Sequence, residues 1–247
     1  MNEVKVRFLG SGDTFGSGGR LQTCIHVDIG ESAFLLDCGA SSLIGLKRWG
    51  VRPSEVDAIL ITHLHGDHFG GVPFFLLDAQ LISKRHQPLV LAGPVSLEAR
   101  IREAMEVLFP GSSQVKQQFS IEYIEFADRK PVEIGSLVVT PYQVLHASGA
   151  PPYALRVECA GKVVTYSGDT EWTEALVCAA KGAHLFICEA YFFEKKIKHH
   201  LDYQTLLAHR NELGCERVIV THMSDDMLNR RASLELECAE DGKLIMI

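Results

Sequence analysis

Three histidines and an aspartate lie within six residues of the chain, in the segment His63-Leu64-His65-Gly66-Asp67-His68. The segment follows an apolar run, Ala58–Thr62, which predicts a strand buried on both faces. Neutral imidazoles and carboxylates are ligands that Zn²⁺, Mn²⁺ and Fe²⁺ accept. Because a glycine interrupts the segment at a strand end, we expect a turn rather than a helix, with several side chains converging on one point. The sequence therefore predicts a metal centre here; a solvated polar turn is the alternative.

Further ligands are expected downstream, because four residues cannot complete two metal sites. Three candidates stand at the ends of predicted strands, namely His146, Asp169 and His222. Strand-end loops on one rim of a sheet scaffold are where sites are commonly assembled. Each candidate alone could be a surface histidine or a helix-capping aspartate. Together the candidates form a set of five histidines and two aspartates: His63, His65, Asp67, His68, His146, Asp169 and His222.

The remaining sequence predicts many short strands with helices inserted and appended. Strands are expected at Val4–Leu9, Cys24–Ile29, Ala33–Asp37, Ala58–Thr62, Pro88–Ala92, Ile121–Phe126, Leu137–His146, Tyr153–Glu158, Lys162–Tyr166, His184–Cys188, Arg217–Thr221 and Lys243–Ile247. Helices are expected at Leu97–Leu108, Trp172–Lys181 and Tyr203–Leu213. This order predicts two sheets packed face to face with helices outside. No Pro/Gly/Ser-rich linker divides the sequence, so we expect a single domain over residues 1–247.

The composition indicates which classes of molecule the protein is expected to bind. The formal charge is −7, from 24 basic and 31 acidic residues, whereas proteins that grip long nucleic acid usually carry a basic excess. We therefore expect a small-molecule substrate rather than a long nucleic acid. The sequence shows neither a signal-peptide core nor an apolar run of membrane-spanning length, so no membrane association is expected. Seven cysteines without a CxxC pattern predict reduced thiols in a cytoplasmic protein.

The segment His63–His68 resembles the HxHxDH signature of the metallo-β-lactamase superfamily, and His146, Asp169 and His222 resemble its later motifs. Four further stretches extend the resemblance over nearly the whole chain: Phe8–Gly12, Leu35–Gly39, Ser167–Thr170 and Asp241-Gly242. The resemblance implies an α/β fold, a four-layer αββα sandwich with a two-metal site between the edges of the inner sheets. It also implies two divalent metal ions as cofactors, zinc first, with manganese or iron as alternatives. A homodimer is expected only by analogy with this fold.

The same resemblance assigns roles to the seven residues. The first metal would be held by His63, His65 and His146, the second by Asp67, His68 and His222, and Asp169 would bridge them. Two metals about 3.5–4 Å apart can polarise a substrate oxygen and generate hydroxide between them. Asp67 would orient that hydroxide, which makes it a catalytic residue as well. Asp37 would hold a ligand histidine in place, although a simple turn carboxylate is an equal alternative.

The segment Lys198–Asp202 indicates which branch of the superfamily this chain resembles. His200 stands 22 residues before His222 and resembles a histidine of ribonuclease Z and of phosphoribosyl cyclic phosphodiesterases. In those enzymes this residue assists cleavage at phosphate without binding metal, and Cys188–Ala190 resembles their matching strand end. The spacing favours His200 over its neighbour His199. Such a histidine can protonate a leaving alkoxide or neutralise charge on phosphorus.

Two departures shape the functional hypothesis. Ribonuclease Z carries a long tRNA-binding arm between the third histidine and the bridging aspartate, but here only 23 positions separate His146 from Asp169. The N-terminal region holds a single cysteine, Cys24, where the phosphonate-pathway enzyme has a cysteine-rich zinc site. We therefore expect a dinuclear metal-dependent hydrolase, a phosphodiesterase for a small cyclic phosphodiester or nucleotide-like substrate. Hydrolysis of a thioester, lactone or lactam, and tRNA 3′-end processing, are the alternatives.

The glycine-rich stretch Gly10–Gly19 lacks the pattern of a phosphate-binding P-loop and predicts a loop near the mouth of the site. Within and beside it, nothing singles out Ser11, Thr14 or Arg20 as phosphate contacts. The phenylalanines after the ligand segment are expected to pack in the core, and Tyr191–Phe193 is expected near the site rim.

Overall fold

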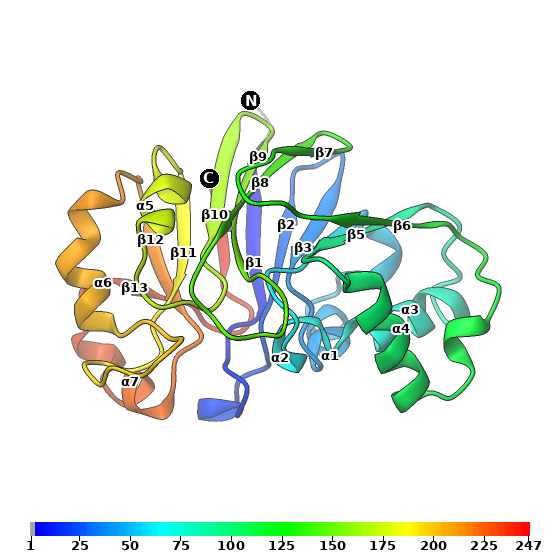
Figure 1. Cartoon of the computed structure of the whole chain (residues 1–247), viewed down its shortest axis with the longest axis horizontal. Coiled ribbons are helices and arrows are strands. Elements are labelled where there is room, and N and C mark those ends of the chain that lie inside the picture. The colour runs from blue at the N-terminus through cyan, green and yellow to red at the C-terminus, as the bar shows by residue number, and fades with distance from the viewer. Residues whose placement is uncertain (1–2) are drawn as a thin grey trace.

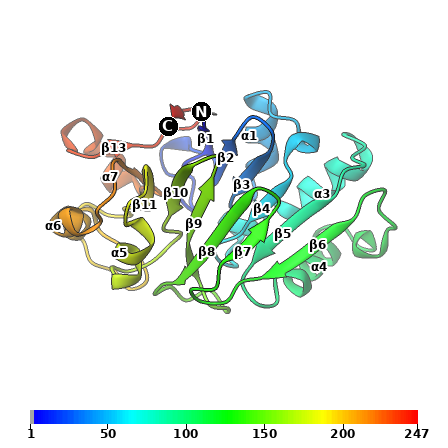
Figure 2. The same cartoon turned by 90° about the horizontal axis from the view of Figure 1, so that it is seen from above.

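The structure is a computed structural model, and it describes residues 3–247. Two seven-stranded sheets lie against each other, and helices cover both outer faces (Figure 1, Figure 2). The four-layer αββα architecture expected from the sequence is confirmed. No helix among the described residues combines the length and apolarity needed to cross a bilayer.

The first sheet has the strand order β14-β1-β2-β3-β4-β5-β6. Its strands are β1 (Lys5–Gly10), β2 (Cys24–Asp28), β3 (Ala33–Leu36), β4 (Ala58–Leu60), β5 (Leu89–Gly93), β6 (Ile121–Glu125) and β14 (Leu244–Met246). The pairs among β14, β1, β2 and β3 are antiparallel, and those from β3 to β6 are parallel. Its outer face packs against α1 (Ser42–Arg48), α3 (Val72–Leu81) and α4 (Leu97–Leu108).

The second sheet has the order β13-β12-β11-β10-β9-β8-β7. Its strands are β7 (Val132–Ile134), β8 (Leu137–Gln143), β9 (Tyr153–Cys159), β10 (Lys162–Tyr166), β11 (Leu185–Glu189), β12 (Val218–Thr221) and β13 (Glu237–Cys238). The strands β10 to β13 run parallel, so the carboxyl ends of β10, β11 and β12 share one edge. Its outer helices are α5 (Glu174–Ala180), α6 (Tyr203–His209) and α7 (Asp225–Asn229).

Strand periodicity divides the core into layers. In β3, Phe34 and Leu36 face the layer between the two sheets, whereas Leu35 faces the helices. In β4, Leu60 faces the inter-sheet layer and Ile59 faces the helices. A strand covered on both faces carries apolar side chains at every position, which explains its continuous apolar run.

Several elements differ from expectation. The ligand segment forms a one-turn helix, α2 (Gly66–Phe69), which carries Asp67 and His68, so the expected turn was wrong. Helices α1, α3 and α7 and strands β7 and β13 were not anticipated. Helix α3 is apolar on its outer side as well as its buried side, so it lacks the contrast that reveals an amphipathic helix. Strand β8 ends at Gln143, before His146, and α6 ends at His209.

Candidate active site

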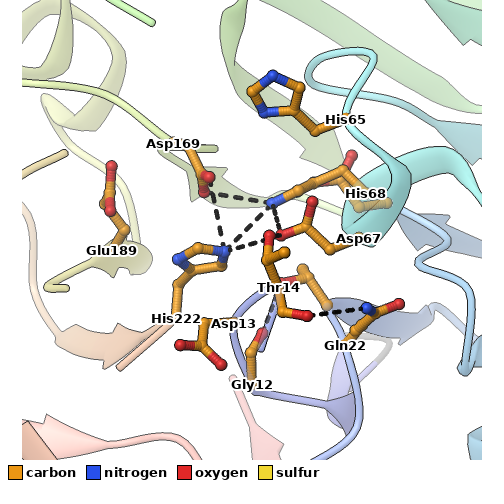
Figure 3. Close-up of polar contacts among 12 residues, drawn as sticks. Gly12, Asp13, Thr14, Gln22, His65, Asp67, His68, Asp169, Glu189 and His222 are labelled. Carbon is orange, nitrogen blue, oxygen red and sulfur yellow. Dashed lines mark hydrogen bonds and ion pairs between the residues drawn. The ribbon is translucent and has the colours of Figure 1, made fainter. Parts of the chain in front are cut away.

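The seven candidate ligands converge at one edge of the two sheets. His63 follows β4, Asp169 follows β10 and His222 follows β12, while His146 lies in the loop after β8. Figure 3 shows the side chains of His68, Asp67, Asp169 and His222 pointing toward one another. Parallel strands place their carboxyl ends together, so residues far apart in sequence become neighbours.

One group consists of His63, His65 and His146, whose ligand atoms lie within 4.8 Å of one another. Nε2 of His146 is 3.0 Å from Nδ1 of His65. Oδ2 of Asp169 is 3.8 Å from Nε2 of His63 and 3.9 Å from Nε2 of His146. This group therefore contains three imidazole nitrogens beside one carboxylate oxygen.

A second group consists of Asp67, His68, Asp169 and His222. Nε2 of His68 lies 3.4 Å from Nε2 of His222 and 3.3 Å from Oδ1 of Asp169. Oδ2 of Asp67 lies 3.3 Å from Nε2 of His222. Asp169 thus lies between the two groups, the place from which one carboxylate can serve both.

Three buried polar atoms of the candidate ligands have no hydrogen-bond partner within residues 3–247: Nε2 of His63, Oδ1 of Asp169 and Nδ1 of His222. Unpaired buried polar atoms are costly and rare in folded proteins. Nε2 of His63 and Oδ1 of Asp169 are metal-ligand types among the converging side chains, and a divalent cation would satisfy them. The residues present therefore fit a divalent metal centre of histidine and aspartate.

The candidate ligand histidines differ in the direction in which their pKa values are shifted. Burial lowers the pKa of His146 to about 4 and holds the pKa of His63 well below its usual value, which favours the neutral form that binds metal. Burial also acts to lower the pKa of His222, but the carboxylates of Asp169 and Asp67 outweigh it and raise that pKa to about 9. A cation that binds there must displace a proton.

Asp37 orients the rings of two candidate ligand histidines through hydrogen bonds on their Nδ1 side. It contacts His68 directly and His63 through Thr62. His68 donates from Nδ1 to Oδ2 of Asp37 at 2.6 Å, which leaves Nε2 for the site. Thr62 donates through Oγ1 to the same carboxylate, and that Oγ1 lies 3.0 Å from Nδ1 of His63. Asp37 therefore lies behind two of the candidate ligand histidines, on the side away from the converging Nε2 atoms.

Three residues around the same site have a backbone in the left-handed region. Nδ1 of His146 donates to the carbonyl of His199 at 2.7 Å, and His199 has a φ of +71°. Asp37 and His222 also have positive φ, at +59° and +56°. Left-handed backbone is unfavourable for residues with a Cβ and persists only where surrounding structure enforces it. The fold thus enforces unfavourable local geometry to hold these side chains.

His200 lies beside the two groups and is held by a buried glutamate that the sequence analysis had given no role. Its Nδ1 is 3.0 Å from Oε2 of Glu189, which is fully buried at the end of β11. Oε1 of Glu189 accepts from the backbone N–H of Thr170. His200 lines the cavity described below, whereas the backbone N–H of His199 donates to Glu171. The geometry therefore separates the two neighbouring histidines, and only the resemblance of Cys188–Ala190 had hinted at Glu189.

The glycine-rich loop reaches the site, as expected, but through a residue that the sequence did not single out. Thr14 donates from Oγ1 to Oδ2 of Asp67, as Figure 3 shows. Asp241 fixes the base of the loop by accepting from Ser11. Arg20 donates instead to the carbonyl of Ala239 and to Ser11, outside the cavity lining.

A cavity of about 740 Å³ opens over the two groups. Its lining residues are Thr14, Phe15, Gln22, Ala40, His65, Gly66, Asp67, Gly70, Phe74, Leu108, Asp169, Tyr191, His200 and His222. Tyr191 thus lies at the rim, as expected. Among the phenylalanines after the ligand segment, Phe69 and Phe75 pack in the core, whereas Phe74 lines the cavity.

Comparison with known proteins agrees with this geometry. The family model described as Anti-Pycsar protein Apyc1 matches residues 4–244. The ribonuclease Z of Agathobacter rectalis is 24% identical over 91% of this chain and 89% of its own length. The metallo-beta-lactamase fold protein YhfI from Bacillus subtilis superposes with a TM-score of 0.79 at 19% identity over 100% of both chains. A diphosphatase from the PhnP family gives a TM-score of 0.75 at 18% identity, over 98% of this chain and 97% of its own.

The match with the family model spans the strands that carry the site, from the glycine-rich loop to the residues after β13. The curated relative and the superposed folds are in keeping with a hydrolase built around histidines and aspartates. This chain accordingly belongs to the Anti-Pycsar protein Apyc1 family and is a metal-dependent hydrolase with the metallo-β-lactamase fold.

Proposed function

We propose that the protein is a dinuclear metal-dependent phosphodiesterase that cleaves a small cyclic phosphodiester or nucleotide-like substrate. The observation that carries the proposal is the pair formed by His200 and Glu189 at the cavity wall. His200 stands outside the seven-residue set yet its Nδ1 is 3.9 Å from Oδ2 of Asp169. A proton donor at this point suits a reaction in which an alkoxide leaves phosphorus.

The metals would be held by His63, His65 and His146 in one group and by Asp67, His68 and His222 in the other, with Asp169 shared; we propose zinc, with manganese or iron as alternatives. When bound, such cations polarise a phosphate oxygen and lower the pKa of water toward 7. Asp67 is placed to orient the attacking water, because Thr14 donates a hydrogen bond to its Oδ2 and fixes the carboxylate.

His200 supplies the proton for the leaving group. Donation from Nδ1 to Glu189 leaves Nε2 for the substrate. Burial acts to lower the pKa of His200, but the hydrogen bond and charge of Glu189 outweigh it and raise the pKa. The raised pKa favours the protonated imidazole, which can donate to the departing oxygen.

The comparisons support phosphate chemistry, since a curated relative is named ribonuclease Z and a structural neighbour is described as a diphosphatase. Processing of tRNA is disfavoured, because the residues between His146 and Asp169 form the hairpin of β9 and β10 and leave no length for an arm. Hydrolysis of a thioester, lactone or lactam would use the same metals. Such a reaction does not account for the pair formed by His200 and the buried Glu189.

A substrate panel with zinc- or manganese-loaded protein tests the proposal. The panel contains a 3′,5′-cyclic nucleotide, bis(p-nitrophenyl) phosphate, a thioester, a chromogenic lactam and a precursor tRNA. We expect turnover of the phosphodiesters. His200→Gln should lose turnover of the cyclic nucleotide and keep its metal, whereas His63→Ala should lose metal. Preferential turnover of the thioester or lactam, or equal metal loss in both variants, would overturn the proposal.

A further inference from the structure

A third group of metal-ligand side chains lies beside the two already described. It consists of Asp169, Glu189, His200 and His222, whose ligand atoms all lie within 4.8 Å of one another. Asp169 and His222 also belong to the seven-residue set, whereas Glu189 and His200 do not. The chain therefore offers two adjacent ligands more than a dinuclear centre would use.

The spacing within this third group suits a small divalent cation. Nδ1 of His200 lies 3.0 Å from Oε2 of Glu189 and 3.9 Å from Oδ2 of Asp169. Zinc bonds of about 2.0–2.2 Å in a tetrahedron place neighbouring ligand atoms about 3.3–3.6 Å apart. The two observed distances lie on either side of that range, so small side-chain movements would bring these atoms onto one ion.

One buried nitrogen of the group has no hydrogen-bond partner within the described part of the chain. This atom is Nδ1 of His222, a residue that is 1% exposed. Nε2 of the same ring faces His68 and Asp67, so Nδ1 faces away from them. Figure 3 shows Glu189 on that far side of His222. A buried unpaired nitrogen beside a buried carboxylate is an arrangement that a cation would satisfy.

Charge determines the order in which ions would bind. The seven-residue set has two carboxylates, from Asp67 and Asp169, to balance two divalent ions. Glu189 contributes one further negative charge, whereas a third ion brings two positive charges. Repulsion between two divalent ions about 4 Å apart weakens binding by about 10³-fold even at the dielectric constant of water, and Glu189 offsets part of it. A third ion would therefore bind only after the first two and more weakly.

The third group can be reached from solvent. His200 lines the cavity, and its side chain is 21% exposed, whereas the side chain of Glu189 is fully buried behind it. An ion that enters the cavity would thus meet the imidazole first and the carboxylate next. Because the same imidazole is the proposed proton donor, an ion bound there would interfere with turnover.

We propose that Glu189 and His200, together with Asp169 and the unpaired nitrogen of His222, form a third cation site that excess zinc occupies and that inhibits the enzyme. The site itself goes beyond the proposed function, and its inhibitory effect rests on that function. The cation takes the electron pair of Nδ1 of His200, and the proton on that atom leaves to solvent. The remaining N–H belongs to a neutral, metal-bound imidazole, a weaker acid than imidazolium, so the leaving group loses its proton donor.

Equilibrium dialysis against buffered free zinc, with bound metal measured by mass spectrometry, tests the site without any substrate. We expect the native protein to bind two ions tightly and a third at a free zinc concentration about 10²-fold or more higher. Glu189→Gln and His200→Gln should each keep the two tight ions, which also shows that the variants are folded, and should lose the third. Glu171→Gln is the matched control and should keep all three, because Glu171 faces Nδ1 of His199 at 3.7 Å, outside the group.

Saturation of the native protein at two ions over the whole range of soluble zinc would overturn the site, as would a third ion retained by both variants. Loss of a tight ion in Glu189→Gln would also overturn it, because Glu189 would then belong to the dinuclear centre.

The inhibitory effect is measured with whichever compound of the substrate panel is turned over. Turnover should fall to half at the zinc concentration at which the third ion is half bound, and unchanged turnover with that ion bound would refute the inhibition. Dialysis gives its answer even if no phosphodiester is cleaved, an outcome that would refute only the proposed function.

Discussion

Replacement of Glu189 by glutamine isolates the contribution of one buried charge to the chemistry. Glutamine keeps the shape of the side chain and can still accept the Thr170 N–H through its oxygen. In the native protein, Nδ1 of His200 lies 3.0 Å from a carboxylate oxygen of Glu189. In the variant, the amide nitrogen of the glutamine faces Nδ1 instead and donates a hydrogen bond to it. The neutral imidazole is then driven to the tautomer with Nδ1 unprotonated and Nε2 protonated, and the imidazolium loses the carboxylate that stabilises it, so less of the stronger acid is present to donate to the leaving group.

Two magnitudes follow. A hydrogen bond to a charged group contributes about 1.5–3 kcal/mol, and one pKa unit corresponds to about 1.4 kcal/mol, so the pKa of His200 should fall by about one to two units. The limb of the rate profile that reports loss of the acid should move to lower pH by that amount. At neutral pH, kcat should fall by up to about 10–100-fold, because a pKa lower by one to two units reduces the protonated fraction of His200 by at most that factor.

Steady-state rates against pH, with metal content measured on the same samples, provide the assay. The loss should be large for a cyclic nucleotide, whose alkoxide needs a proton, and small for bis(p-nitrophenyl) phosphate, whose leaving group does not. Glu171→Gln is the matched control, since Glu171 accepts from the backbone of His199 rather than from the His200 ring. An unshifted profile for Glu189→Gln, or equal losses on both substrates, would refute the role of Glu189.

Three further outcomes are expected. Zinc affinity should rise about ten-fold per pH unit between pH 6 and 8 for each proton displaced, because His222 has a pKa of about 9 and that of His68 is also raised despite burial; competition with a chelator measures this, and a flat response would contradict it. His199→Gly should keep turnover and raise the free energy of unfolding by up to about 1 kcal/mol in urea titration, because it relieves left-handed strain; a loss of turnover equal to that of His200→Gln would return the catalytic role to His199. Asp37→Asn should weaken zinc binding by about 10–100-fold, because it removes the charge that orients His68; unchanged affinity would leave Asp37 a simple turn residue.

The candidate ligands could be predicted because most of them follow apolar strands, and strand ends are visible in sequence as abrupt changes of polarity. His222 comes directly after β12, and His63 comes a few residues after the end of β4. His146 lies beyond the end of β8, and the order of motifs rather than strand periodicity identified it. Helix α2 escaped prediction because four residues are too few for any periodic pattern and too short to be stable alone.

The contacts that complete the site could not be predicted in the same way. Thr14 and Asp67 are 53 positions apart, and their pairing depends on how the loop after β1 folds over the sheet edge. Glu189 reads as one more residue of a buried strand until β11 is placed beside β10 and the segment before α6 returns to it. Phe74 lies on a helix that is apolar all round, so nothing in its spacing separates a cavity wall from the core.

The arrangement of contacts also explains why strained residues are tolerated at this edge. His68 and His146 each use Nδ1 to contact the protein, and that contact fixes the ring before any cation is considered. Such orientation requires Asp37 and His199 to adopt left-handed backbone, which is unfavourable by about 1–3 kcal/mol for each residue. The extensively buried layer between the sheets can compensate for that amount, whereas an isolated loop could not. Ligand geometry is therefore a property of the packed sheets, and a cation would bind to side chains already aimed at it.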